Sequence, residues 1–413
     1  MLNVALVVGL GAAGHSQMPQ PSWPQWGGPL RNFITSDPGL LLEWPAVGPR
    51  RRWQRPLGDG FSSIVTDGAT LYTLYRSGDD DVAVAIDSET GKLVWETKYA
   101  APFNETCSNK LGPTPRATPL IAGEHLITIS AGGLMNTFAR STGARVWTRN
   151  LSQLSSPVRP CGYSSSPLAH GGLIITSGSH RGMVAFDAKT GQTAWHMPDF
   201  DQSYSSPIVV DVGGTMELIT LTGTDVVGLN PDTGRVEWTH PHPAEFGANV
   251  TTPVWGGDGL LFLSSSYDGG SRVLRVERRD GKVTVQQVWH HQRVRVHFGN
   301  AVRMGNRVFA SSGDTGSAPL VALDALTGET AWRSRAVGRA MLVGAGGRLI
   351  LLDEDGNLAL ATPGDAGLTL HAKAQVMEGV SWTPPTLSGT TLFIRNRQTI
   401  MALELGRPTP GAR

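Results

Sequence analysis

Charged residues are scarce and nearly balanced in this 413-residue chain. Asp, Glu, Lys and Arg together make up 17% of the sequence, and the formal net charge is +1. A chain with so little net charge has no broad electrostatic attraction for nucleic acid or for an anionic membrane surface. We therefore expect no nucleic acid among its partners. A local charged patch on the surface is still compatible with this composition.

Long apolar runs are absent after the first residues. Val4–Leu10 is apolar, and residues 12–14 are small, as at a signal-peptide cleavage site. The run is too short to span a membrane as a helix, so we interpret residues 1–16 as a signal peptide. We expect an exported protein that does not span the membrane. No Lys or Arg precedes Arg31, so the basic region that normally begins a signal peptide is lacking. The true start of the signal peptide is therefore open, and a disordered apolar tail is the alternative interpretation.

Familiar sequence signatures of catalysis are missing too. The chain contains no Gly-x-Ser-x-Gly nucleophile elbow, no phosphate-binding loop and no His-Glu-x-x-His motif. The densest acidic run, Asp-Asp-Asp at 79–81, is typical of a solvated turn, and the three serines at 164–166 are typical of a tight inner strand. We identify no catalytic residue and no metal ligand.

Glycine, by contrast, is abundant and belongs to a repeat. The string Thr-Gly, three residues, Trp occurs five times, and a degenerate copy has a longer spacer. The glycine and tryptophan pairs are Gly91 and Trp95, Gly143 and Trp147, Gly191 and Trp195, Gly234 and Trp238, Gly281 and Trp289 (the degenerate copy), and Gly328 and Trp332. A seventh copy has His371 where Trp is expected. The tryptophans lie 43 to 52 residues apart, a period that suits one four-stranded propeller blade.

Each copy carries the same strand signals. An alternating strand such as Val82–Ile86 leads in most copies to an acidic residue that can bond its own backbone, and the glycine supplies a positive φ in the turn. The next strand places its Trp between adjacent blades, where a large apolar area is buried. We therefore expect these tryptophans to be structural.

The two ends of the chain complete the ring. The carboxyl end adds three strands without a closing Trp, whereas residues 52–55, which include Trp53, resemble the missing outer strand. The sequence thus predicts an all-β, eight-bladed β-propeller of four-stranded antiparallel blades over residues 50–405, closed by an N-terminal strand that completes the last blade. Residues 17–49 form an extended leader and 406–413 a disordered tail.

These copies resemble the pyrroloquinoline-quinone (PQQ)-like β-propeller repeat, Ala-Leu-Asp-x-x-Thr-Gly-x-x-x-Trp. The leader run Trp23–Pro29 is also similar to a segment that precedes such propellers in exported bacterial proteins. The superfamily includes quinoprotein alcohol dehydrogenases and non-catalytic scaffolds such as the propeller subunit of the outer-membrane protein assembly machinery. The repeat therefore implies the fold and leaves these functions open.

The chemistry of the dehydrogenases fits this sequence poorly. In the dehydrogenases, the resemblance implies a quinone that lies above a Ca²⁺ ion and beneath a disulfide of adjacent cysteines. The Ca²⁺ ion itself needs several oxygen ligands, usually carboxylates and amides. This chain has only Cys107 and Cys161, and its expected inner loops contain no carboxylate cluster. The resemblance implies a periplasmic or secreted bacterial protein. We expect a monomeric, non-catalytic scaffold without a cofactor that binds a protein or a small ligand. A PQQ- and Ca²⁺-dependent alcohol dehydrogenase is the alternative.

Both cysteines follow a blade-closing tryptophan. Cys107 comes 12 residues after Trp95, and Cys161 comes 14 residues after Trp147. Both therefore fall in loops on the same face of successive blades. In an exported protein this placement predicts a disulfide.

The loop face carries the predicted ligand site. Its central funnel is the default position for a ligand. The polar and aromatic residues that map there are Arg116, Tyr163, His180, Arg181, Tyr204, Asn249, Tyr267, His297, Asn300, Arg339 and Trp382. The basic segment 290–303 either binds an anion or an acidic strand or is simply a strand with alternating exposed basic residues.

Overall fold

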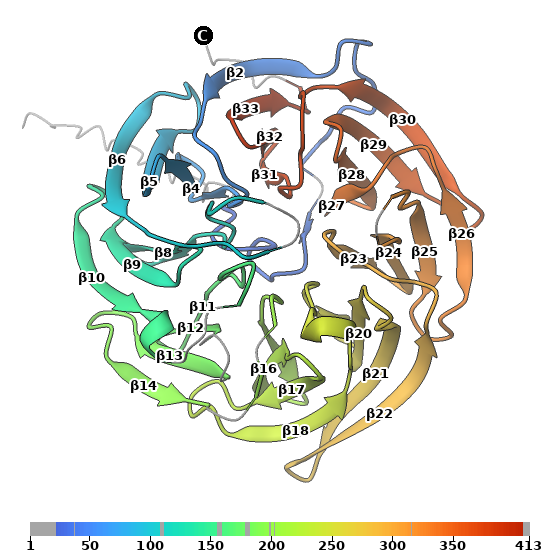
Figure 1. The fold of residues 1–413 in the computed structure, drawn as a ribbon. Coiled ribbons are helices and arrows are strands. Elements are labelled where there is room, and N and C mark those ends of the chain that lie inside the picture. Colours follow the sequence, from blue (N-terminus) through green and yellow to red (C-terminus); the bar gives the residue numbers. More distant parts are fainter. Residues whose placement is uncertain are drawn as a thin grey trace, which may run out of the picture.

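The computed structural model describes residues 22–36, 38–107, 111–154, 159–177, 182–197, 200–201, 203–314 and 316–407. Within them, eight four-stranded antiparallel blades form a ring around a central axis (Figure 1), so the predicted eight-bladed propeller is confirmed. In seven blades the chain runs from the inner strand outward. No described helix is long and apolar enough to cross a membrane.

Seven blades are each built from four consecutive strands. Blades 1 to 4 comprise β3 (Val65–Thr66), β4 (Thr70–Ser77), β5 (Asp80–Asp87), β6 (Leu93–Ala100); β7 (Leu120–Ala122), β8 (His125–Ile129), β9 (Leu134–Ala139), β10 (Arg145–Asn150); β11 (Leu168–His170), β12 (Leu173–Ser177), β13 (Met183–Asp187), β14 (Thr193–His196); and β15 (Ile208–Val212), β16 (Thr215–Leu221), β17 (Asp225–Leu229), β18 (Val236–Pro241). Blades 5 to 7 comprise β19 (Val254–Trp255), β20 (Leu260–Ser265), β21 (Gly270–Arg279), β22 (Lys282–His291); β23 (Ala301–Met304), β24 (Arg307–Ser311), β25 (Leu320–Asp324), β26 (Thr330–Ser334); and β27 (Ala340–Ala345), β28 (Arg348–Asp353), β29 (Asn357–Pro363), β30 (Leu368–Gln375). Two 3-10 turns, η1 (Leu151–Gln153) and η2 (Glu245–Gly247), lie in the loops.

The eighth blade joins the two ends of the chain. Its inner strands are β31 (Thr386–Ser388), β32 (Thr391–Arg395) and β33 (Thr399–Glu404), and its outer strand is β2 (Arg50–Pro56). Strand β2 pairs antiparallel with β33 and places Trp53 opposite Ala402. This pairing covers the edge that the C-terminal strands would otherwise expose, and the predicted N-terminal closure is confirmed.

The repeated motif links most blades to the next. Asp87 Oδ1 accepts hydrogen bonds from the N–H and hydroxyl groups of Thr90, which shape the turn before the outer strand. Trp147 Nε1 donates to the carbonyl of Ala188 in the following blade (3.1 Å), and its ring covers Gly191. Gly191 has φ +67°, and a Cβ there would lie 2.7 Å from that ring. The motif therefore needs glycine for both conformation and space.

One tryptophan departs from this pattern. Six of the seven predicted blade tryptophans donate to a turn carbonyl of the next blade. Trp238 instead donates to buried Glu217 in its own blade (2.6 Å). The next blade carries the degenerate copy, whose strands β21 and β22 form a long protruding hairpin in place of the usual turn (Figure 1).

Hydroxyl groups join the inner strands of successive blades. The N–H of Ser63 donates to Thr118 Oγ1 (3.2 Å), that of Thr118 to Ser166 Oγ (2.9 Å), and that of Ser166 to Ser206 Oγ (3.0 Å). All four residues are buried. The small polar residues before the inner strands therefore satisfy buried N–H groups as well as fitting a crowded axis.

The leader crosses the centre of the ring. Strand β1 (Ile34–Thr35) pairs parallel with β27, on the inner side of blade 7, and Trp23 exchanges backbone hydrogen bonds with Thr66 of blade 1. Arg31 is buried and donates to the carbonyls of Ser166, Pro167 and Pro207 in blades 3 and 4. The leader is thus an integral part of the propeller.

Two local predictions are wrong. The acidic run at 79–81 is not a solvated turn throughout, because Asp81 lies in β5 with no exposed surface and pairs with Arg76 at 3.1 Å. Burial raises the pKa of Asp81 to about 6. The basic segment 290–303 is not one strand either: β22 ends at His291 and β23 begins at Ala301, with a loop between them.

Candidate functional site

A funnel of 510 Å³ opens on the face that carries the loops between blades. Its walls come mostly from the segments that connect the outer strand of one blade to the inner strand of the next, and Tyr267 comes from the β20–β21 loop of blade 5. At its base lies Trp26 of the leader, whose Nε1 donates to Thr252 Oγ1 (2.8 Å) and whose ring packs edge-on against Phe33. This volume falls within the range of roughly 300–1,000 Å³ typical of ligand sites.

Six rings follow one another around the funnel, and we call them the aromatic ladder. In order they are Phe61, Trp382, Phe298, His297, Tyr267 and Phe246. The first three contacts are stacked, with centroids 5.7, 5.1 and 3.8 Å apart, and the last two are edge-to-face at 4.8 and 5.8 Å. All six rings line the cavity. The ladder therefore offers an extended aromatic surface rather than one isolated ring.

Local interactions fix the middle of the ladder. The carbonyl of Asp314 lies 2.8 Å from His297 Nδ1, and burial lowers the pKa of His297, which favours the neutral imidazole. Burial alone would raise the pKa of the Asp314 carboxyl, but hydrogen bonds from Ser266 and Arg295 hold it below its ordinary value. The ladder thus contains a neutral histidine, and the Asp314 carboxylate behind it is paired.

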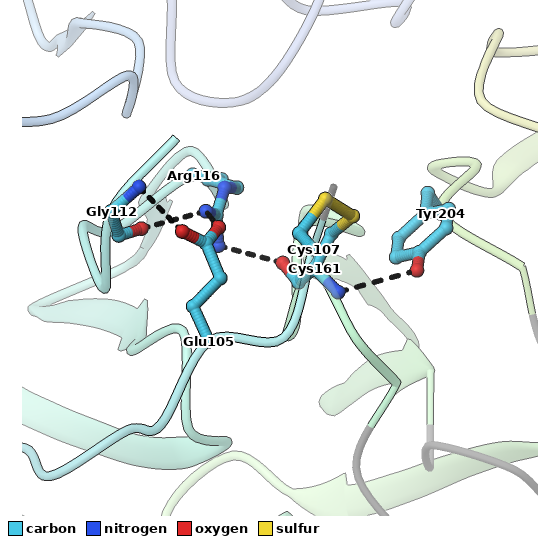
Figure 2. The surroundings of a disulfide bond; sticks show 6 residues. All are labelled: Glu105, Cys107, Gly112, Arg116, Cys161 and Tyr204. Atoms are coloured by element: carbon cyan, nitrogen blue, oxygen red, sulfur yellow. Dashed lines mark hydrogen bonds and ion pairs between the residues drawn. A yellow bond between two sulfur atoms is a disulfide. The ribbon is translucent and has the colours of Figure 1, made fainter. Parts of the chain in front are cut away.

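A disulfide builds the opposite wall (Figure 2). Cys107 and Cys161 are bonded, with Cα atoms 4.7 Å apart, and tie the loop after blade 1 to the loop after blade 2. Arg116 donates to the Cys161 carbonyl (2.6 Å) and forms an ion pair with Glu105. The hydroxyl of Tyr204 lies 3.5 Å from the Cys161 amide nitrogen. The disulfide therefore holds both the charged and the aromatic groups of this wall.

Most cations near the funnel are neutralised. The pairs are Arg116 with Glu105, Arg397 with Asp59, Arg339 with Glu354, and Arg295 with Asp314. Arg159 differs, because no carboxylate in the described ranges lies within ion-pair distance of it, and its Nε has no hydrogen-bond acceptor there. Its guanidinium lies 5.2 Å from the centroid of Tyr204, and Nη2 makes a long hydrogen bond to the Gly247 carbonyl (3.4 Å). Arg159 is therefore the cation most available to a ligand.

The backbone is strained at one end of the ladder. Phe246 and Tyr267 have φ values of +62° and +50°, in the left-handed region that disfavours residues with a Cβ. Phe246 is also 75% exposed. A solvent-exposed aromatic ring on a strained backbone contributes little to folding, so this end of the funnel is a candidate contact for a ligand.

The structure brings together six of the predicted site residues. These line the funnel: Arg116, Tyr204, Tyr267, His297, Asn300 and Trp382. Tyr163 lies in a small neighbouring cavity, and Arg339 lines another that shares Phe298 and Trp382 with the funnel. Asn249 is buried behind the wall, where its amide donates to the Thr222 carbonyl (2.7 Å). His180 and Arg181 lie outside the described residues.

Sequence reasoning missed several residues of the funnel. They are Trp26, Phe61, Arg159, Phe246 and Phe298. Trp26 belongs to a leader whose path across the axis has no local sequence signal. The others stand in irregular loops, where no periodicity indicates which way a side chain points.

The funnel does not present the donor set that Ca²⁺ requires. Among the described residues, no group of three or more His, Cys, Asp or Glu side chains is arranged to hold a metal ion. The carboxylates of Glu105 and Asp59, at the funnel's edge, are each paired with an arginine. Calcium in proteins prefers six to eight oxygen ligands. The residues present therefore do not fit a Ca²⁺-supported quinone site.

Comparison with known proteins connects the chain to one family. The model described as outer membrane protein assembly factor BamB matches residues 46–198, 154–285 and 269–375. Curated relatives with that name come from Shewanella oneidensis (25% identity over 50% of this chain and 49% of the relative) and Yersinia pestis (24% over 72% and 74%). The chain thus spans about half the length of the Shewanella relative it matches.

Solved structures share the fold. The BamB structure from Moraxella catarrhalis has a TM-score of 0.63 at 16% identity, covering 86% of this chain and 100% of that one. A quinohemoprotein alcohol dehydrogenase from Comamonas testosteroni has a TM-score of 0.67 at 12% identity, covering 96% and 82%. At such identities the similarity shows the propeller architecture, and function has to be argued from the site.

Proposed function

Because this chain belongs to the family of the outer membrane protein assembly factor BamB, we propose that it is an exported, non-catalytic propeller that binds a protein partner during outer-membrane protein assembly. The family match over residues 46–375 is the observation that carries this proposal. We expect the protein to work in the periplasm, in keeping with the apolar segment at its start.

The funnel face supports a binding function. Its wall is tied by the Cys107–Cys161 disulfide, and its base is formed by Trp26 of the leader. Hydrogen bonds from backbone N–H groups to serine hydroxyls join the inner strands of adjacent blades. A surface ordered in this way before binding loses little conformational entropy when a partner docks. The propeller therefore suits a scaffold that presents a preformed face.

Genetic complementation tests the proposal. Deleting the gene in its own bacterium should lower the amount of folded outer-membrane β-barrels, and the wild-type gene should restore it. Trp382→Ala, in the funnel, should restore it only in part, while Arg279→Gln at the exposed tip of the β21–β22 hairpin should restore it fully. Unchanged outer-membrane proteins in the deletion strain would contradict the proposal.

The alternative function has its own assay. Titration of the mature protein with pyrroloquinoline quinone and Ca²⁺, followed by calorimetry and a dye-linked alcohol assay, should give neither stoichiometric binding nor turnover. Tight binding with alcohol oxidation would instead establish a quinoprotein dehydrogenase.

A further inference from the structure

We infer that the funnel captures an extended polypeptide segment through an aromatic side chain next to a carboxylate. The aromatic side chain packs on the Phe246 and Tyr267 end of the ladder, and the carboxylate pairs with Arg159. This inference rests on the proposed scaffold function and specifies what the scaffold recognises. It follows from three features of the same end of the funnel: exposure, strain and charge.

Exposure and strain point to a ligand contact at Phe246. The ring is 75% exposed and touches Tyr267 edge-on at 5.8 Å, while its backbone has φ +62°. Burying this side chain against a partner would remove apolar surface from water. Apart from its edge-on contact with Tyr267, the exposed ring adds little to folding, and glycine adopts this backbone conformation more easily. A contact with a partner accounts for a Phe at this position.

Arg159 supplies an available positive charge at this end. Arg159 lies next to the Phe246 loop, since its Nη2 reaches the Gly247 carbonyl, and it stacks on Tyr204. The Tyr204 N–H donates to the Asn249 carbonyl (3.0 Å), which ties the two loops together. Arg116, further along the wall, is occupied by Glu105. A carboxylate entering beside Phe246 would therefore meet Arg159 first.

The length of the ladder favours an extended occupant. The rings form five successive contacts from Phe61 to Phe246, so they cover more length than a single planar ring can fill. Aromatic side chains pack on such rings in offset or edge-to-face geometry. Phe246 stands exposed, where a chain that continues beyond the funnel can cover it. These features fit a polypeptide better than a compact small molecule.

Fluorescence anisotropy of the mature protein with labelled peptides tests the inference. The probe is Ac-Ser-Gly-Phe-Asp-Gly-Ser-amide, and the matched probes replace Phe with Ala or Asp with Asn. Phe246→Ala should weaken binding of the Phe-Asp probe at least tenfold. Arg159→Gln should weaken it at least fivefold but leave the Phe-Asn probe unchanged, because only the former loses a charge pair.

Matched variants separate binding from folding. Val47→Ala and Arg279→Gln remove an exposed apolar and an exposed basic side chain outside the funnel, and both should leave affinity unchanged. Phe246→Gly relieves the strained backbone, so its melting temperature should be equal to or above that of the wild type while binding is lost. A structural role alone would not produce this combination.

Several results would overturn the inference. One is the absence of binding of the Phe-Asp probe at millimolar concentration. Another is equal affinity of the wild type for all three probes. A third is an affinity of the Phe246 and Arg159 variants for the Phe-Asp probe that equals that of the wild type. If these variants also restore outer-membrane proteins fully in the deletion strain while Trp382→Ala does not, the scaffold proposal stands and only this assignment fails. If the deletion strain has normal outer-membrane proteins, the scaffold proposal itself fails.

Discussion

Removal of the disulfide should cost the protein a measurable part of its stability. Cys107 and Cys161 are 54 residues apart in sequence. A cross-link of that span reduces the entropy of the unfolded chain by about 14 cal/mol/K, which corresponds to about 4 kcal/mol at 25 °C. The double variant Cys107→Ser/Cys161→Ser should therefore have a free energy of unfolding lower by about that amount.

The disulfide variant should also loosen the funnel wall. Arg116 and Tyr204 both contact the backbone of Cys161, so the double variant should bind the Phe-Asp probe more weakly. Urea denaturation followed by tryptophan fluorescence measures the stability change, and a reductant should destabilise the wild type but not the double variant. A loss below about 1 kcal/mol would refute the chain-entropy reasoning.

Three further predictions address the core. Arg31→Met leaves three buried carbonyls without a donor and should lower the free energy of unfolding by about 3 kcal/mol in urea denaturation; an unchanged midpoint would contradict the packing of the leader. Burial lowers the pKa of His242 to about 3 from its ordinary 6.5, so the unfolded chain takes up this proton first and stability should fall as pH drops from 6.5 towards 3, by about 1.4 kcal/mol per unit. Denaturation curves of the His242→Gln variant at pH 7, 5 and 4 should lack this pH-dependent loss of stability. The raised pKa of Asp81 makes stability rise as pH falls from 6 to 3.8, but Asp81 is present in both proteins and cancels in the comparison. Identical pH profiles of the two proteins would disprove the assignment to His242. Trp147→Leu opens a gap between two blades and should cost about 3 kcal/mol, measured by thermal denaturation with Leu30→Ala as the exposed control; equal melting temperatures would be inconsistent with its packing.

The fold could be predicted from sequence because its determinants are local and repeated. Gly191 has a positive φ and also lies under Trp147 of the preceding blade. A regular copy of the motif therefore indicates a contact between two adjacent blades. The degenerate copy around Gly281 likewise marks the place where the outer hairpin lengthens and Trp238 changes its partner. The segment around Trp53 could be assigned as the missing outer strand because its Trp packs against the next blade as the other blade tryptophans do.

The site was only partly predictable because its determinants are not periodic. Loop position along the repeat mapped Tyr267 and Trp382 to the funnel, and both side chains line it in the structure. It could not show that Asn249 turns behind the wall, because that depends on which backbone carbonyls accept from its amide. Nor could it show that Phe246 adopts a left-handed backbone or that the leader brings Trp26 to the base of the funnel. These features arise from contacts distant in sequence.

Site-specific crosslinking in the living bacterium tests directly whether the funnel contacts a polypeptide. The photoreactive residue p-benzoylphenylalanine would replace Phe246 in the funnel or, as a control, Val47, which is exposed in the leader. We expect a covalent adduct with a polypeptide at position 246 that is much stronger than at position 47. No adduct at position 246, together with quinone-dependent alcohol oxidation by the purified protein, would contradict this expectation.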